Sequence, residues 1–169
     1  MTLHYGLISR NQALMTAIAV NSAISPKSDK NGVAIILETA CAETLLGKLK
    51  DPTTYSAGSS LCQIDKGTFD WLQDKYSDKL VAQRITAAFG FNLADIQYRE
   101  IELNPLLAMV WCRLRYLTLI QPIPSTTEKR AELWKKYYNT KAGAGTVGGY
   151  ITKCNNCDVA SLLHTVYPN

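Results

Sequence analysis

The residue whose type and position best suit chemistry is Glu43, which lies near the end of an apolar, helix-like run over residues 33–44. A carboxyl group in apolar surroundings resists ionisation because its charged form loses hydration. The negative end of a helix dipole opposes the carboxylate as well. A carboxylic acid that keeps its proton near neutral pH can protonate the oxygen that leaves when a glycosidic bond breaks. We therefore take Glu43 as the candidate catalytic acid.

A second acid, Glu38, lies five residues earlier in the same run. Five residues rotate an α-helix by about 140° net, so the two side chains cannot face one pocket equally. Glu38 lies in the middle of the run and is either a buried hydrogen-bonding residue or a solvent-facing one. We expect its replacement to change stability rather than chemistry.

Two stretches around these acids have the pattern of a known family. Glu43, Thr44 and Gly47 match the element E-[S/T]-x-x-G, and residues 56–63 (SAGSSLCQ) are similar to S-G-A-x-G-L-M-Q. Both elements are those of goose-type lysozymes and soluble lytic transglycosylases. In that family the glutamate is the catalytic acid and the second segment lines the sugar cleft.

A third stretch, residues 138–150, resembles the element Y-N-x-G-x-G-x-V-x-x-Y of the same family, whose tyrosine contacts the catalytic acid. The three elements occur in the family's order and span most of the chain. The sequence departs from the pattern at Ser60 and Cys62, which replace a glycine and a methionine, and at three extra residues, 140–142. These departures concern the contacts in the cleft more than the acid.

The resemblance implies a mainly α, single-domain lysozyme-like fold over residues 1–169, with a central buried helix and a substrate cleft. It implies cleavage of peptidoglycan glycan strands between N-acetylmuramic acid and N-acetylglucosamine, with Glu43 as general acid. It also implies substrate-binding or supporting roles for six residues: Thr44, Leu61, Gln63, Tyr138, Asn139 and Tyr150.

The product depends on a second carboxylate. A lytic transglycosylase needs none, because the 6-hydroxyl of muramic acid attacks the sugar itself, whereas an inverting muramidase needs a carboxylate across the ring. Asp65 is the candidate, since residues 63–66 resemble the Q-V-D-K run of goose-type lysozymes, and Asp51 is the weaker alternative. Asp65 could equally be the N-cap of a helix that starts near Gly67. A non-catalytic module that binds cell-wall glycan is a further alternative.

Composition sets the class of protein. A chain of 169 residues with 47% apolar and 19% charged residues suits one well-packed soluble domain. The net charge of +4 comes from dispersed Lys and Arg and mildly favours polyanionic partners such as envelope polymers. A basic stripe interleaved with aromatic residues is lacking, which argues against nucleic acid as the partner. The resemblance implies peptidoglycan instead, and we expect a monomer.

The five cysteines do not suggest a metal centre or a disulfide framework. We expect buried, reduced thiols, since an odd number cannot pair fully and three lie in apolar surroundings. Cys154 and Cys157, with His164 seven residues on, have a spacing found in zinc sites, but a second pair is lacking. We therefore expect neither a metal nor a cofactor.

The apolar stretch over residues 13–20 is too short to span a bilayer. Arg10 before it is weakly reminiscent of a signal peptide, but residues 9–12 read as a helix capping box, which favours an intact first helix. We expect no export signal and no stable membrane insertion. The chain looks like a bacteriophage endolysin that is made in the host cytoplasm and acts on the cell wall from the periplasm.

Capping and breaking residues predict the helices that must position these side chains. Asn104 and Pro105 open a strongly apolar helix, which we expect to be the central buried one. Residues 96–103 partly alternate and suggest a short extended segment, and the glycines within 143–149 suggest a turn. We expect Trp71, Trp111 and Trp134 in the core. The helices are predicted over residues 10–23, 32–46, 67–75, 78–89, 105–117, 126–138 and 159–166.

Overall fold

The computed structural model describes residues 3–27, 30–52, 57–139 and 143–168. Within these ranges the chain is mainly helical, and extended pairing is limited to one isolated bridge between Ser59 and Ile64. The α-helices are α1 (Arg10–Ile24), α2 (Lys30–Thr44), α3 (Lys66–Tyr76), α4 (Leu80–Phe89), α5 (Pro105–Leu117), α6 (Thr127–Trp134), α7 (Val147–Asn156) and α8 (Val159–His164). Short 3-10 segments cover Leu93–Asp95 and Tyr98–Ile101, and a π-helical turn covers Lys135–Asn139.

Polar side chains cap the helices at the positions where the sequence places them. The side chains of Ser9, Asp65, Asn104, Thr126 and Thr146 each accept a hydrogen bond from a backbone N–H in the first turn of the helix that follows. Each bond satisfies a donor that has no partner inside its helix, which fixes where the helix begins. The predicted starts of α1, α3 and α5 are thereby confirmed to within one residue.

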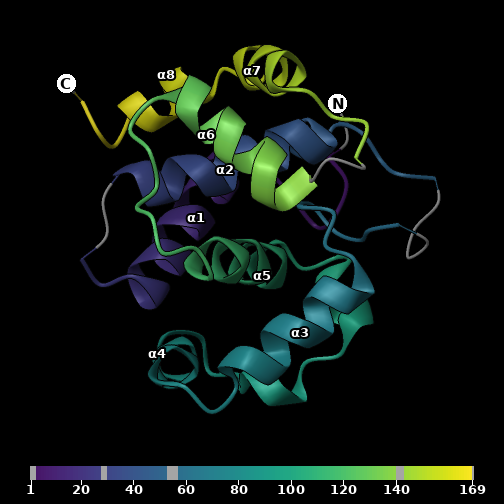
Figure 1. Cartoon of the computed structure of the whole chain (residues 1–169), viewed down its shortest axis with the longest axis vertical. Coiled ribbons are helices and arrows are strands. Elements are labelled where there is room, and N and C mark those ends of the chain that lie inside the picture. The colour runs from purple at the N-terminus through teal and green to yellow at the C-terminus, as the bar shows by residue number, and fades with distance from the viewer. Residues whose placement is uncertain (1–2, 28–29, 53–56, 140–142, 169) are drawn as a thin grey trace.

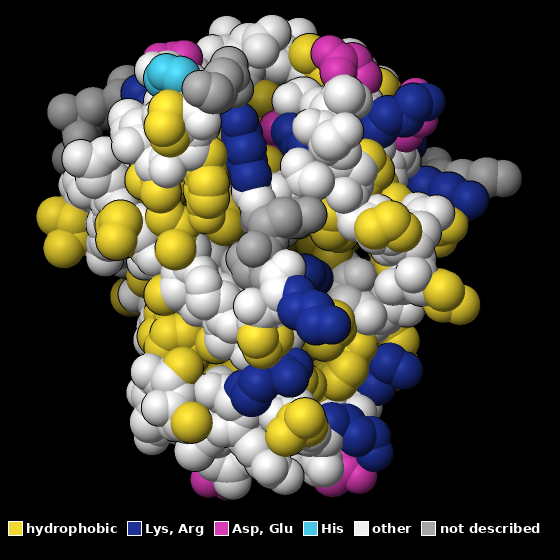
Figure 2. All heavy atoms as spheres, turned by 90° about the vertical axis from the view of Figure 1, so that its left-hand side faces the viewer, with side chains coloured by type: hydrophobic (Ala, Val, Ile, Leu, Met, Phe, Trp, Pro, Cys, Tyr) yellow, Lys and Arg dark blue, Asp and Glu magenta, His cyan; other side chains and the backbone are white. Residues whose placement is uncertain are grey.

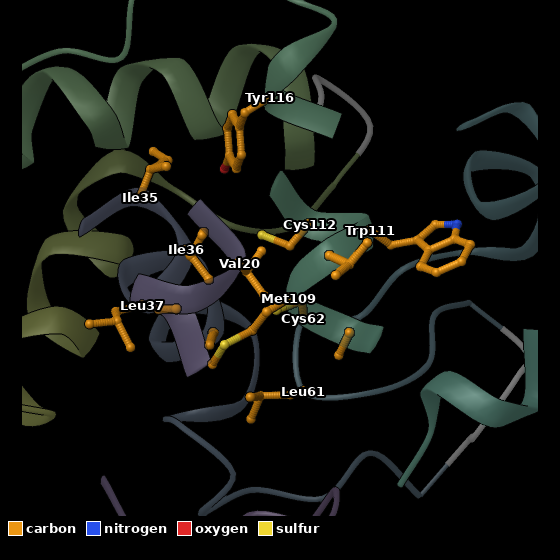
Figure 3. Packing of buried hydrophobic residues seen from close by; sticks show 14 of the residues in the cluster. Val20, Ile35, Ile36, Leu37, Leu61, Cys62, Met109, Trp111, Cys112 and Tyr116 are labelled. Atoms are coloured by element: carbon orange, nitrogen blue, oxygen red, sulfur yellow. The ribbon is translucent and has the colours of Figure 1, made fainter. Parts of the chain in front are cut away.

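The core is built around α5, as predicted. This helix crosses the middle of the molecule, with α1 and α2 on one side and α3 on the other (Figure 1). Trp111 points from α5 toward α3, where its ring stacks on Phe69 at 4.6 Å between centroids and its indole N–H donates to the Phe69 carbonyl over 3.2 Å. On the opposite side, Tyr116, which Figure 3 labels, shares a hydrogen bond of 2.8 Å with Thr39 of α2.

Four local predictions were wrong. Residues 98–101 form a 3-10 turn instead of an extended segment. The glycines at 148 and 149 lie in the first turn of α7, where a turn was expected. Helix α2 ends at Thr44, and the next three residues, 45–47, are all left-handed with φ of 49°, 54° and 79°. Trp71 is 43% exposed, whereas Trp111 and Trp134 are buried as expected.

Two features of the described residues concern the expected partners: the length of the apolar helices and the distribution of basic side chains. None of the helices within the described residues is long and apolar enough to cross a membrane. On the face in Figure 2, Lys and Arg side chains are scattered among apolar and neutral ones and do not form a continuous stripe.

Candidate functional site

Glu43 lies in the last turn of α2 with its side chain half-buried. It faces a groove of about 350 Å³, which is lined by residues from separate parts of the chain. The groove therefore exists only when α2, the segment before α3 and the segment after α6 are packed together. Its lining residues are Glu43, Ala57, Gly58, Gln63, Asp65, Tyr138, Asn139 and Gly143.

The carboxyl group of Glu43 holds its proton unusually well. Burial raises its pKa from 4.5 to about 7, because the carboxylate would lose hydration that the apolar end of α2 does not replace. Two neighbours work in the opposite direction: the indole of Trp134 donates to Oε1 over 2.9 Å, and the ammonium group of Lys153 attracts the carboxylate. At neutral pH the group is therefore divided between acid and carboxylate.

Trp134 is the contact to Glu43 that sequence reasoning missed. It ends α6, and its ring packs against Tyr150 of α7 with 5.2 Å between centroids. Gly145 lies against the other part of the ring, where an added Cβ would come within 2.4 Å of Cη2. The glycine therefore leaves the room that the indole needs to reach the acid, and the glycine-rich element supports the site through Trp134.

The segment Ser59–Ile64, named here the cleft turn, closes one side of the groove. Ser59 and Ile64 pair through two backbone hydrogen bonds of 2.9 Å, and Ser60 and Gln63 adopt positive φ of 77° and 49°. Such conformations cost free energy and persist only where the surroundings hold them. The buried carboxylate of Glu102 provides one restraint, accepting bonds from the Ser59 hydroxyl and the Ser60 N–H.

Hydroxyl groups of three other segments anchor the carbonyls of the cleft turn. Thr44 donates to Leu61 over 2.8 Å, and Tyr98 donates to Ile64 over 2.7 Å. Tyr138 donates to Cys62 over 2.7 Å, and burial raises the pKa of its hydroxyl well above the ordinary value, so it stays neutral. The turn is thereby tied directly to the end of α2 that carries the acid.

The six residues assigned to substrate or support divide into two groups. Gln63, Tyr138 and Asn139 line the groove beside Glu43. Three others, Thr44, Leu61 and Tyr150, are buried with exposed fractions of 2%, 0% and 1%, so they can act only by supporting others. The contact to the acid that the resemblance gives to a tyrosine is made by the tryptophan instead, while the Tyr138 hydroxyl faces the cleft turn.

Asp65 is both a helix N-cap and a residue of the groove, the two positions that the sequence left open. It is the N-cap of α3, and its two carboxylate oxygens accept from the backbone N–H and the hydroxyl of Thr68 over 2.9 and 2.6 Å. It also lines the groove that contains Glu43. Asp51, the weaker alternative, is absent from that lining, and its backbone N–H donates to the hydroxyl of Tyr5 over 2.8 Å.

Glu38 is a buried structural acid, which decides between the two alternatives left open for it. Only 2% of the residue is exposed, and both of its oxygens accept bonds of 2.7 Å from the guanidinium of Arg130. Thr127 and Tyr150 each add a hydrogen bond of 2.9 Å. The ion pair ties α2 to α6 and thereby holds the helix that carries Trp134.

Two larger hollows, of about 560 and 620 Å³, lie elsewhere on the surface, and neither is lined by Glu43. Size alone would favour them, but the acid in each is already paired, Asp70 with Lys66 and Glu38 with Arg130. Cys154 and Cys157 are both buried, and no group of three or more His, Cys, Asp or Glu side chains among the described residues is arranged to hold a metal ion. Ser56 and residues 140–142, which belong to the matched elements, lie outside the described ranges.

Comparison with known proteins adds no relative. No family model, no curated protein and no solved structure matches the chain. The resemblance to lysozymes and transglycosylases therefore depends on the ordered residues of the three sequence elements alone and stays a prediction.

Proposed function

We propose that this protein cleaves the glycan strands of peptidoglycan between N-acetylmuramic acid and N-acetylglucosamine, in a lysozyme-like cleft with Glu43 as the general acid. The observation that carries the proposal is a half-buried carboxyl group with a pKa of about 7 that opens onto a groove lined by polar side chains. Gln63, Tyr138 and Asn139 offer an amide, a phenol ring and a second amide to a sugar chain. The order of the three sequence elements supports the same reaction.

The proposed chemistry starts with the protonated form of Glu43. The acid gives its proton to the bridging oxygen, the bond from that oxygen to C1 of muramic acid breaks, and positive charge develops on the sugar ring. In a lytic transglycosylase the 6-hydroxyl then attacks C1, and the carboxylate takes the hydroxyl proton. One residue thus serves as acid and then as base, and the product has a 1,6-anhydro end.

Inverting hydrolysis is the second candidate, and the position of Asp65 favours it. This reaction needs a carboxylate that activates water on the opposite face of the ring, about 6.5–9.5 Å from the acid. Asp65 lines the same groove as Glu43, and Thr68 holds its carboxylate in a fixed orientation. If Asp65 acts in this way, the product has a reducing muramic acid end.

The test is digestion of purified sacculi followed by mass spectrometry of the released muropeptides. We expect anhydromuramic ends from a transglycosylase and reducing ends from a muramidase, and Asp65→Asn should stop only the second reaction. Glu43→Gln should lower the rate by about 100-fold or more, since that is the usual contribution of general acid catalysis. Glu132→Gln, which changes an exposed glutamate of α6, serves as the matched control.

Release of neither product by the wild-type protein would refute the proposal. If the protein instead sediments with sacculi and Glu43→Gln binds equally well, the chain is a wall-binding module. The biological role that we propose with this activity is host lysis by a bacteriophage endolysin. Expression in the cytoplasm should then lyse cells only when a membrane-permeabilising protein is made at the same time.

A further inference from the structure

Beside the groove of Glu43 lies a small hollow of about 30 Å³, called here the extension, which shares three lining residues with the groove. Gln63, Asp65 and Tyr138 border both parts, whereas Glu43 borders only the first. The extension is completed by Ile64 and Thr68 and by the guanidinium-bearing side chain of Arg115 at the end of α5. A polymer chain that passes from the groove to the extension would therefore move from Glu43 past Asp65 to Arg115.

Two contacts hold Arg115 in place. One terminal nitrogen donates to the Tyr137 carbonyl over 2.6 Å, and the guanidinium carbon lies 5.3 Å from the centroid of the Trp71 ring. Stacking on an aromatic face and a backbone bond together limit the orientations of a guanidinium. None of the ion pairs found among the described residues includes Arg115. Its charge is thus fixed in the groove with hydrogen-bonding capacity to spare.

The contact with Arg115 explains why Trp71 is exposed. Trp71 lies three residues after Thr68 on α3, so both side chains are on the face of the helix that borders the extension. Because Trp71 is 43% exposed, it gives up part of the stabilisation that full burial of its ring would provide. Its ring instead supports Arg115, and the Lys75 ammonium lies 5.9 Å from the ring centroid. The extension therefore contains one cationic group, Arg115, and one acid, Asp65, whose two oxygens are already held by Thr68.

Building on the function proposed above, we propose that Arg115, positioned by Trp71, forms a subsite. This subsite binds a carboxylate carried on the lactyl side of a muramic acid residue. A guanidinium presents paired N–H donors that match the two oxygens of a carboxylate. In peptidoglycan such a carboxylate comes from the free lactyl group of a peptide-free strand or from the stem peptide. The subsite would hold the strand in the groove through its muramic acid residue and so add to the affinity for substrate.

The test measures binding in the Glu43→Gln background, so that turnover does not consume the ligand. The probes are strands with stem peptides, strands freed of peptide by an amidase, and neutral chitooligosaccharides of equal length. Arg115→Gln should weaken binding of the anionic strands by about tenfold, as expected for the loss of a charged hydrogen bond, and leave the chitooligosaccharides unchanged. Whichever anionic strand loses more identifies the source of the carboxylate.

Arg84→Gln is the matched control, because Arg84 also donates to one backbone carbonyl, that of Ile24, at 2.9 Å, and is not among the residues that line the groove. Arg115→Lys keeps the charge and should recover part of the affinity, which separates recognition from a loss of fold; thermal unfolding checks each variant. In the otherwise wild-type enzyme, Arg115→Gln should raise KM without changing kcat, since Arg115 does not touch the reacting atoms.

If Arg115→Gln weakens the binding of anionic and neutral ligands equally, or does not weaken binding at all, the subsite is refuted. The proposed function still stands in that case, provided that the wild-type enzyme cleaves sacculi. If the wild-type enzyme cleaves nothing and the Glu43→Gln protein binds none of the three probes, both proposals are refuted.

Discussion

Glu43→Gln should make the protein more stable, with a gain that begins above pH 4.5 and is complete only above about pH 7. The carboxyl group has a pKa of 4.5 when exposed and about 7 in the folded chain. Between these values the folded state binds more protons than the unfolded state, so the free energy of unfolding of the wild type falls as pH rises. Below pH 4.5 Glu43 is protonated in both states, so its contribution to the free energy of unfolding no longer changes with pH. Glutamine resembles the protonated acid and is free of this loss.

The size of the effect follows from the shift. Each pKa unit corresponds to about 1.4 kcal/mol, so a rise from 4.5 to about 7 is worth about 3 kcal/mol, which we reduce to about 2 kcal/mol because the groove admits solvent. For a domain of this length that is a rise in Tm of about 4–8 °C. The amide oxygen can still accept from the indole of Trp134, so the variant keeps the hydrogen bond.

The assay is urea unfolding of the wild type and the variant at pH 4 and pH 8. We expect a difference of about 2 kcal/mol at pH 8 and little at pH 4. Glu132→Gln removes a surface ion pair with Lys129 and should change stability by no more than about 0.5 kcal/mol at either pH. An equal gain at both pH values, or none at pH 8, would refute the reasoning that desolvation keeps Glu43 protonated.

Three further predictions follow from the contacts behind the groove. Trp134→Phe removes the N–H that lowers the pKa of the Glu43 carboxyl, so the alkaline limb of the proposed lysis rate against pH should move upward; a downward shift would contradict the assigned bond. Gly145→Ala places a Cβ within 2.4 Å of that indole and should cost about 1–3 kcal/mol in chemical unfolding, whereas Gly148→Ala, with open space around it, should be nearly neutral. Glu38→Gln leaves a buried guanidinium poorly paired and should cost about 3 kcal/mol, with the rate per folded molecule unchanged; a stable but inactive variant would show that Glu38 acts in catalysis.

The helices that begin with a polar cap were predictable from sequence because a cap is a local interaction. Asn104 followed by Pro105 identifies both the start of α5 and, with the apolar residues after it, its burial. Helix α7 was missed because glycines at 148 and 149 disfavour a helix by about 1 kcal/mol each. The packing of Tyr150 and Cys154 in the core outweighs that local preference.

The site was only partly predictable for a related reason. The environment of Glu43 could be judged from its neighbours in the chain, since an apolar helix end is a local property. Its bond to Trp134 spans 91 positions and depends on how α6 packs on α2, which no local pattern reports. The same holds for the pairing of Glu38 with Arg130 and for the stacking of Arg115 on Trp71, because each joins side chains from different helices.

The central claim is that the carboxyl group of Glu43, facing the groove, has a pKa of about 7, so that a large share of it is still protonated at neutral pH. The most direct test is a carbon-detected NMR titration of the side-chain carboxyl groups, with the Glu43→Gln variant used to assign the signal. The account predicts a midpoint of about 7 for Glu43. A midpoint near the ordinary value of 4.5 would contradict it, because the residue would then be a carboxylate throughout the neutral range and could not supply the proton.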